Sequence, residues 1–187
     1  MKEFVILGIA GSLRNESYNR SLLRAATELV PEGVRLETFE LNGMPMFNQD
    51  EEQNPHPKVA ELKQRVRAAD AILFVTPEYN YSIPGVLKNA IDCASRPYGD
   101  SAWAGKPVAV MGASIGTLGT ARAQYHLRQT FVFLNMHAVN QPEVMVANAS
   151  DRFDQNGKLT DEKTKKLVQQ LLAELVNWTR RLSTPTD

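Results

Sequence analysis

Short apolar runs alternate with stretches of helical spacing along most of this chain. The continuous apolar runs at 4–9 and 71–75 predict strands that are covered by helices on both faces, near the centre of a sheet. The segment 34–41 mixes charged and apolar side chains, which favours an outermost strand. Further strands are predicted at 108–112 and 144–147. This alternation is typical of a parallel α/β sheet.

Apolar residues at helical spacing occupy the intervals between these strands. They mark one face of a helix within 22–30 and another within 59–69, and a further helix is predicted to begin near Pro84. The segment 118–136 is predicted to be a long helix, although its final residues have strand propensity. The last helix is expected to begin near Thr160, where acidic residues in the first turn oppose the helix dipole favourably.

Five parallel strands with crossover helices on both faces predict a flavodoxin-like three-layer α/β sandwich with strand order 2-1-3-4-5. No repeat or linker divides the sequence, so we expect a single domain over 1–187, with 184–187 as a frayed tail. Ligands of such sheets bind beyond the carboxyl ends of the strands, where the strand order reverses. The ligand site is therefore expected at the loops after Ile9, Val75 and Gly112.

Composition excludes several classes of function. Basic and acidic residues number 21 each, and a net charge of zero argues against nucleic acid and anionic membrane surfaces as partners. The single cysteine, Cys93, is expected to be a buried, inert side chain and suits a reducing, cytoplasmic compartment. Three scattered histidines predict no metal site. No apolar run is long enough for a signal segment or a membrane span.

The loop after the first strand has the residues of a phosphate site. It reads GSLRNESYN at 11–19, where Ser12, Ser17 and Asn19 offer hydrogen bonds and Arg14 offers a forked cationic donor. The helix that follows would add free N–H groups and the positive end of its dipole. The serines and the asparagine can equally serve as helix caps. The residues alone leave both interpretations open.

The loop after the third strand, TPEYNYSIPG at 76–85, combines aromatic rings, amide groups and stiffening prolines. Such a loop can stack on a planar heteroaromatic ligand and bond its polar edge. Alternatively, Ser82 caps the helix near Pro84 and the tyrosines pack against a neighbour. The small residues of 112–119 let backbone approach a ligand, although glycine-rich loops are common.

The stretches GSLRNESYNR at 11–20 and TPEYNYSIPGVLKNAID at 76–92, together with GTARAQYHLRQ at 119–129, resemble the NAD(P)H-dependent FMN reductase family, which includes quinone and chromate reductases. The resemblance implies bound FMN, and NADPH or NADH as electron donor. It assigns to the flavin phosphate Ser12, Arg14, Ser17 and Asn19, to the isoalloxazine ring Pro77, Glu78, Tyr79 and Asn80, and to its neighbourhood Ser82, Ser114 and Gly116. It also implies a homodimer or homotetramer with flavin sites close to a subunit interface.

The expected activity is hydride transfer from the nicotinamide to FMN, and onward to a quinone, azo compound, metal oxyanion or similar acceptor. No catalytic side chain is expected, because the flavin N5 carries the hydride. The sequence also lacks a GxGxxG fingerprint for a separate dinucleotide domain. Three alternatives stay open: a flavin reductase that releases reduced FMN to a partner, a flavodoxin-like electron carrier, and a non-catalytic protein that kept the fold. The neutral charge weakens the carrier.

A few residues outside these loops have competing interpretations. The long, polar segment 42–57 is either functional or mobile. Trp103 can cover a flavin or a subunit contact. Anchoring a long loop is the commoner role of such a residue. Arg122 and Tyr125 share a predicted helix face, from which they can reach Glu143 or a neighbouring subunit.

Overall fold

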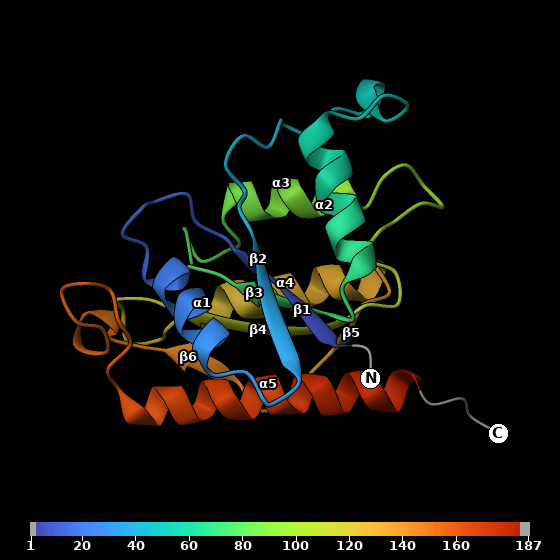
Figure 1. The fold of residues 1–187 in the computed structure, drawn as a ribbon. Coiled ribbons are helices and arrows are strands. Elements are labelled where there is room, and N and C mark those ends of the chain that lie inside the picture. Colours follow the sequence, from blue (N-terminus) through green and yellow to red (C-terminus); the bar gives the residue numbers. More distant parts are fainter. Residues whose placement is uncertain (1–2, 184–187) are drawn as a thin grey trace.

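The computed structural model describes residues 3–183, which form a parallel sheet with helices on both faces (Figure 1). The strands are β1 (Phe4–Ala10), β2 (Val34–Phe39), β3 (Ala71–Val75), β4 (Pro107–Ala113), β5 (His137–Ala138) and β6 (Val144–Val146). The α-helices are α1 (Tyr18–Glu28), α2 (Pro57–Ala68), α3 (Gly85–Ala94), α4 (Ala121–Phe133) and α5 (Glu162–Ser183), and short 3-10 helices occupy Gln49–Glu51 and Ala149–Asp151.

The strand order is β2-β1-β3-β4-β5, with every pairing parallel, which confirms the predicted order 2-1-3-4-5. β2 lies at the edge, as its charged residues predicted. All five residues of β3 are buried because helices cover both of its faces. The single domain over 1–187 stays a prediction, and its expected tail at 184–187 lies outside the described residues.

The place of the fifth strand is divided between two short segments, where the sequence predicted one strand at 144–147. β5 pairs with the first two residues of β4, and β6 pairs with its last three. Pro142 lies between the two segments and carries no backbone N–H for a ladder bond.

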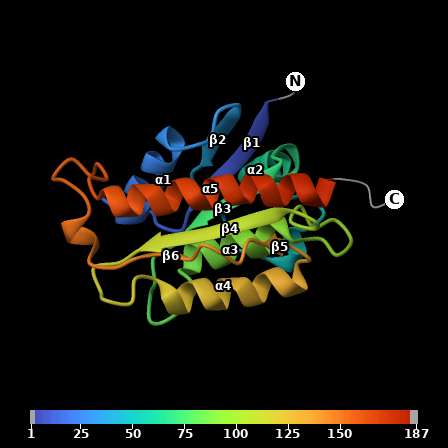
Figure 2. The same cartoon turned by 90° about the horizontal axis from the view of Figure 1, so that it is seen from below.

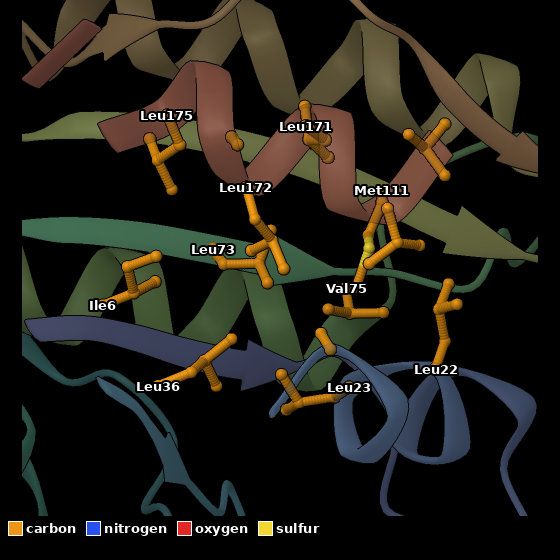
Figure 3. Close-up of a cluster of buried hydrophobic side chains, with 14 of the residues drawn as sticks. Ile6, Leu22, Leu23, Leu36, Leu73, Val75, Met111, Leu171, Leu172 and Leu175 are labelled. Atoms are coloured by element: carbon orange, nitrogen blue, oxygen red, sulfur yellow. The ribbon is translucent and has the colours of Figure 1, made fainter. Parts of the chain in front are cut away.

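The two faces of the sheet carry separate hydrophobic cores. On one face, α1 and α5 pack on the strands, and leucines of both helices point into one layer with strand residues such as Leu73 and Met111 (Figure 3). Figure 2, seen from below, shows α5 running across this face. On the other face, α2, α3 and α4 cover a second cluster that includes Phe74 and the fully buried Trp103. Successive strand residues therefore face opposite cores.

Two helices differ slightly from their predicted bounds. α4 is shorter than 118–136, and its last residues are helical through Phe133 despite their strand propensity. α5 begins at Glu162, where the Asp161 carboxylate accepts hydrogen bonds from the Thr164 backbone N–H at 2.8 Å and hydroxyl at 2.6 Å. These bonds lower the Asp161 pKa. None of the helices within residues 3–183 is both apolar and long enough to cross a bilayer.

The long segment 42–57 is fastened to α3. Asn89 donates to the Pro45 carbonyl at 2.7 Å and accepts from the Phe47 N–H at 2.8 Å. Its side-chain amide thus pairs with the backbone of this segment as the backbone of an adjacent strand does. Arg96 adds an ion pair with Glu52 at 2.6 Å. The segment is therefore held at Pro45, Phe47 and Glu52 by side chains of α3 and of the residues that follow it.

Trp103 and Cys93 have the structural roles that were expected to be the commoner ones. The Trp103 indole N–H donates to the Ile91 carbonyl at 2.9 Å, which anchors the connection between α3 and β4. Cys93 is 6% exposed, and burial raises the pKa of its thiol.

Candidate functional site

Three loops leave the carboxyl ends of β1, β3 and β4 at one edge of the sheet, at the left of Figure 1. Backbone bonds continue the parallel ladder into their first residues. Gly11 donates to Val75 at 2.9 Å, and Thr76 donates to Met111 at 3.0 Å. The structure thus brings the predicted residues of 12–19, 77–82 and 114–116 to the same edge.

The first loop ends in a capped helix. Ser17 is the N-cap of α1, and its hydroxyl oxygen accepts from the Asn19 N–H at 3.3 Å; the Ser12 hydroxyl accepts from the Arg14 N–H at the same distance. The capping role that the sequence left open is therefore real. Both hydroxyls act as acceptors in these bonds, so their protons remain available to a ligand oxygen.

Arg14 supplies an uncompensated positive charge beside these serines. Its side chain is exposed, and it has no ion pair within residues 3–183. Its guanidinium carbon lies 5.8 Å from the centroid of the Tyr18 ring. Two buried hydroxyls, an unpaired guanidinium and a helix N-terminus form a donor set that suits a phosphate group.

Asn19 joins the first loop to the third. Its side-chain NH₂ donates to the Ala113 carbonyl at 2.9 Å, and its carbonyl oxygen accepts from the Ala113 N–H, also at 2.9 Å. The side chain is buried, and these bonds use its carbonyl oxygen and one of the two N–H donors of its NH₂ group. The contact of Asn19 with phosphate stays a prediction, and the bonds that the structure shows hold α1 against the end of β4.

The second loop contains a tight turn with an unusual backbone. Tyr79 and Ser82 exchange two backbone hydrogen bonds, at 3.1 and 3.0 Å. The two central residues, Asn80 and Tyr81, have φ values of 51° and 65°, as in a type I′ turn. Asparagine tolerates this conformation, whereas a bulky residue there costs about 1–3 kcal/mol. The loop therefore stores backbone strain at the predicted ligand edge.

Ser82 does not cap the following helix. The N-cap of α3 is Pro84, with no side-chain cap bond. The Ser82 hydroxyl lies instead 3.0 Å from Nδ1 of His126 on α4. The alternative in which Ser82 is a helix cap is thus wrong, because the hydroxyl faces a different helix.

The side chain of Glu78 binds to the start of α4. The carboxylate, 6% exposed, accepts from the backbone N–H groups of Arg122 at 3.0 Å and Ala123 at 3.3 Å, and pairs with the Arg122 guanidinium. By accepting these two N–H groups the carboxylate caps α4, whereas the N-cap residue Thr120 makes no side-chain cap bond. Because the carboxylate is used in these bonds, Glu78 would contact a ligand ring through its backbone.

Arg122 completes this cluster. Its guanidinium carbon lies 3.6 Å from the centroid of the Tyr81 ring, and the hydrogen bond to Glu78 raises its pKa. Of the two contacts with Glu143 considered from the sequence, that of Tyr125 is confirmed: its hydroxyl lies 3.4 Å from the Glu143 carboxylate, which raises the Tyr125 pKa. The pairing of Arg122 with Glu78 was not foreseen.

The third loop leaves room beside its backbone. The Ser114 hydroxyl accepts from the Gly116 N–H at 3.1 Å. A Cβ atom added to Gly116 would meet only that hydroxyl, at 3.6 Å. By contrast, a Cβ on Gly112 would lie 2.1 Å from the Thr120 hydroxyl. Gly112 is thus needed for packing, whereas the space at Gly116 is open to a ligand.

Exposed apolar residues border the same loops, and three of them, Leu13, Ile115 and Leu118, were missed from the sequence. Leu13, Ile115 and Leu118 are 44%, 70% and 56% exposed, and Tyr79 and Tyr81 are 50% and 67% exposed. Isolated apolar residues in loops follow no period, so the sequence carries no signal for them. A flat apolar ring would find its contact surface here. The described residues contain no group of three or more His, Cys, Asp or Glu side chains arranged for a metal ion.

Comparison with known proteins gives consistent matches over most of the chain. A family model described as NADPH-dependent FMN reductase matches residues 4–151. An NAD(P)H-dependent FMN reductase of Pseudomonas aeruginosa is 53% identical over 178 residues, which cover 95% of this chain and 96% of the relative. A quinone reductase of Pseudomonas putida is 44% identical over 173 residues, or 92% of each chain. The solved structure of the flavoenzyme NAD(P)H:(acceptor) oxidoreductase FerB from Paracoccus denitrificans superposes with a TM-score of 0.86 at 37% identity, covering 95% of this chain and 98% of that one.

Proposed function

Because this chain belongs to the NADPH-dependent FMN reductase family, we propose that it is an FMN-dependent NAD(P)H oxidoreductase that reduces quinones or similar small molecules. The observation that carries the proposal is the shared sheet edge, where phosphate donors on the first loop lie beside an aromatic turn on the second. When bound, FMN supplies the centre that accepts and returns the hydride. The protein's part is to bind, orient and polarise the flavin ring.

The first loop is proposed to hold the flavin phosphate. Ser12 and Ser17 donate their hydroxyl protons, Arg14 supplies the charge, and the N-terminus of α1 adds its dipole. Asn19 belongs to this assignment through its position between α1 and Ala113, which fixes the loop that carries the serines.

The second and third loops are proposed to hold the flavin ring. Pro77, Glu78, Tyr79 and Asn80 contribute backbone and ring surface, and Ser82, Ser114 and Gly116 lie close by. The open space at Gly116 and the exposed tyrosines suit a planar ring better than a compact ligand. The face of the ring that points to solvent would receive the nicotinamide and the acceptor in turn.

The acceptor class is proposed from relatives of similar length. Besides the quinone reductase named above, a 2-hydroxy-1,4-benzoquinone reductase of Burkholderia is 43% identical over 92% of this chain. A quinone is a flat molecule that can stack where the nicotinamide stacked. Azo compounds and metal oxyanions are further candidates for the same open face.

We also propose that the protein works in the cytoplasm as a homodimer or homotetramer. Support for assembly comes from the end of α4, where Val132 and Phe133 are 83% and 79% exposed, and from Tyr98, which is 75% exposed and lines the same surface groove as Phe133. Large apolar side chains gathered in this way are typical of subunit contacts. A single buried thiol and the absence of disulfides suit a reducing compartment.

The test is a visible spectrum of the purified protein, followed by anaerobic addition of NADPH. We expect a flavin spectrum, retained or restored by added FMN, that bleaches with NADPH and recovers with a quinone. Co-elution of reduced flavin with the protein on gel filtration would separate this function from that of a flavin-releasing reductase. A protein that neither takes up FMN nor oxidises NADPH would refute the proposal, and flavin uptake without NADPH oxidation would favour an electron carrier.

A further inference from the structure

We infer that Glu78 is a positioning residue that holds the strained turn at 79–82 against α4 and thereby sets the affinity of the protein for the flavin ring. The inference rests on the proposed function, because it takes the ring to bind at this turn. It concerns the side chain of Glu78, which contacts α4 rather than the open edge.

The turn needs an external support. Both of its central residues have positive φ, and neither is glycine. Such a conformation persists only where the surrounding structure imposes it. The two backbone bonds between Tyr79 and Ser82 close the turn, but a turn of other type would close it as well. Support must therefore come from outside the turn.

That support comes from one helix. The Glu78 carboxylate binds the first turn of α4 through two backbone N–H groups and the Arg122 guanidinium, and the guanidinium covers the Tyr81 ring. One helical turn further on, His126 reaches Ser82 at 3.0 Å. Of these contacts, the bonds of Glu78 are the best shielded from water, since its side chain is 6% exposed.

The turn also presents unused donors. Within residues 3–183, the backbone N–H groups of Asn80 and Tyr81 have no hydrogen-bond partner. Donors held in place near a ring stabilise the negative charge that reduction adds to it. If Glu78 fixes the turn, its loss should weaken binding of any flavin, and should weaken binding of reduced flavin most.

A second cluster of the same chemistry provides a matched control. Arg96 pairs with Glu52 at 2.6 Å and lies 3.7 Å from the centroid of the Tyr98 ring, so it repeats the Glu–Arg–Tyr arrangement. Arg96 follows the C-terminus of α3, and α3 begins at the flavin edge, so this cluster lies toward the opposite end of the helix layer. Glu52→Gln should therefore cost stability without affecting the ring.

The experiment measures affinity for lumiflavin, which has the ring but no phosphate, and for FMN. We expect Glu78→Gln to weaken both flavins by the same factor, about tenfold, while Glu52→Gln changes neither more than twofold. The melting temperature of the flavin-free protein should fall in both variants. Equal effects of the two variants on lumiflavin, or an unchanged affinity in Glu78→Gln, would overturn the inference.

A charge-balanced variant tests positioning separately from charge. Glu78→Gln combined with Arg122→Gln leaves the net charge unchanged, so a lower reduction potential would report the displaced turn. We expect reduced FMN to lose about tenfold more affinity than oxidised FMN, which corresponds to about 30 mV for two electrons. An unchanged potential would overturn the inference. Should Glu78→Gln fail to fold, Arg122→Lys keeps the charge and should weaken lumiflavin about threefold; no loss there would count against the inference.

The outcomes also separate this inference from the proposed function. A parent protein that binds neither FMN nor lumiflavin would refute both. A parent protein that binds both flavins and oxidises NADPH, with an unchanged Glu78→Gln variant, would refute only the role of Glu78.

Discussion

Replacing Arg14 with alanine removes a cation that no described carboxylate compensates. A charge-assisted hydrogen bond from its guanidinium to a phosphate oxygen is worth about 1.5–2.5 kcal/mol at an exposed position, or roughly 10- to 70-fold in Kd. Riboflavin has the same ring but no phosphate, so its Kd should change less than twofold. The variant should fold normally, since the nearest described contact of the guanidinium is the Tyr18 ring at 5.8 Å.

The assay is flavin fluorescence quenching with FMN and riboflavin at low and high salt. Arg20→Ala is the matched control, because Arg20 also belongs to the start of α1 but is paired with Glu40 at 3.0 Å. The FMN advantage of the parent over Arg14→Ala should shrink as salt rises, because ions screen exposed charges. Equal losses for FMN and riboflavin, or an effect of Arg20→Ala as large as that of Arg14→Ala, would show that Arg14 is not the phosphate ligand.

Three further substitutions test other parts of the structure. Gly116→Ala should weaken FMN binding without lowering the melting temperature of the flavin-free protein, because the added Cβ meets open space; a fall in both would contradict this. Asn19→Ala should lower the free energy of unfolding, measured in urea, by about 2–4 kcal/mol, because it leaves the buried N–H and C=O of Ala113 without partners. A loss below about 1 kcal/mol would contradict this role of Asn19. The Asp161 carboxylate has a pKa below its ordinary value of 3.8, so its bonds to Thr164 stabilise the fold above that pH and are lost as pH falls through the lowered pKa. The difference in stability between the parent and Asp161→Asn should therefore be constant near pH 7 and shrink below pH 4, and a constant difference down to pH 2 would refute it.

Much of the fold is visible in the sequence because strand burial leaves a strong signal. The run at 71–75 is apolar throughout, and β3 has the same bounds. The division of the fifth strand is invisible, because β5 has only two residues and so shows no period. The three loops of the candidate site were predicted from topology, since they follow strands whose carboxyl ends share an edge.

The contacts within the site were harder to foresee because they join residues that are distant in the chain. Arg122 and Glu78 are 44 positions apart, and the sequence offers 21 acidic residues as partners for any arginine. The turn at Asn80 and Tyr81 contains no glycine, so the residue types alone do not indicate positive φ at both positions. Nothing local reveals the bonds of Asn19 to Ala113, which lies 94 positions away. Local chemistry thus identified the loops, and long-range contacts decided what each side chain does in them.

The hydrogen bonds between Asn89 and the segment 42–57 have a consequence for protein engineering. Because the amide fixes Pro45 and Phe47, and Arg96 fixes Glu52, the exposed tip at 53–56 is isolated from the sheet edge that carries the loops of the site. The entropy of closing a loop grows only slowly with its length. An affinity tag or a small reporter domain inserted between Gln53 and Asn54 should therefore leave the sheet and its ligand edge intact, which makes this tip the natural attachment point for immobilising the protein.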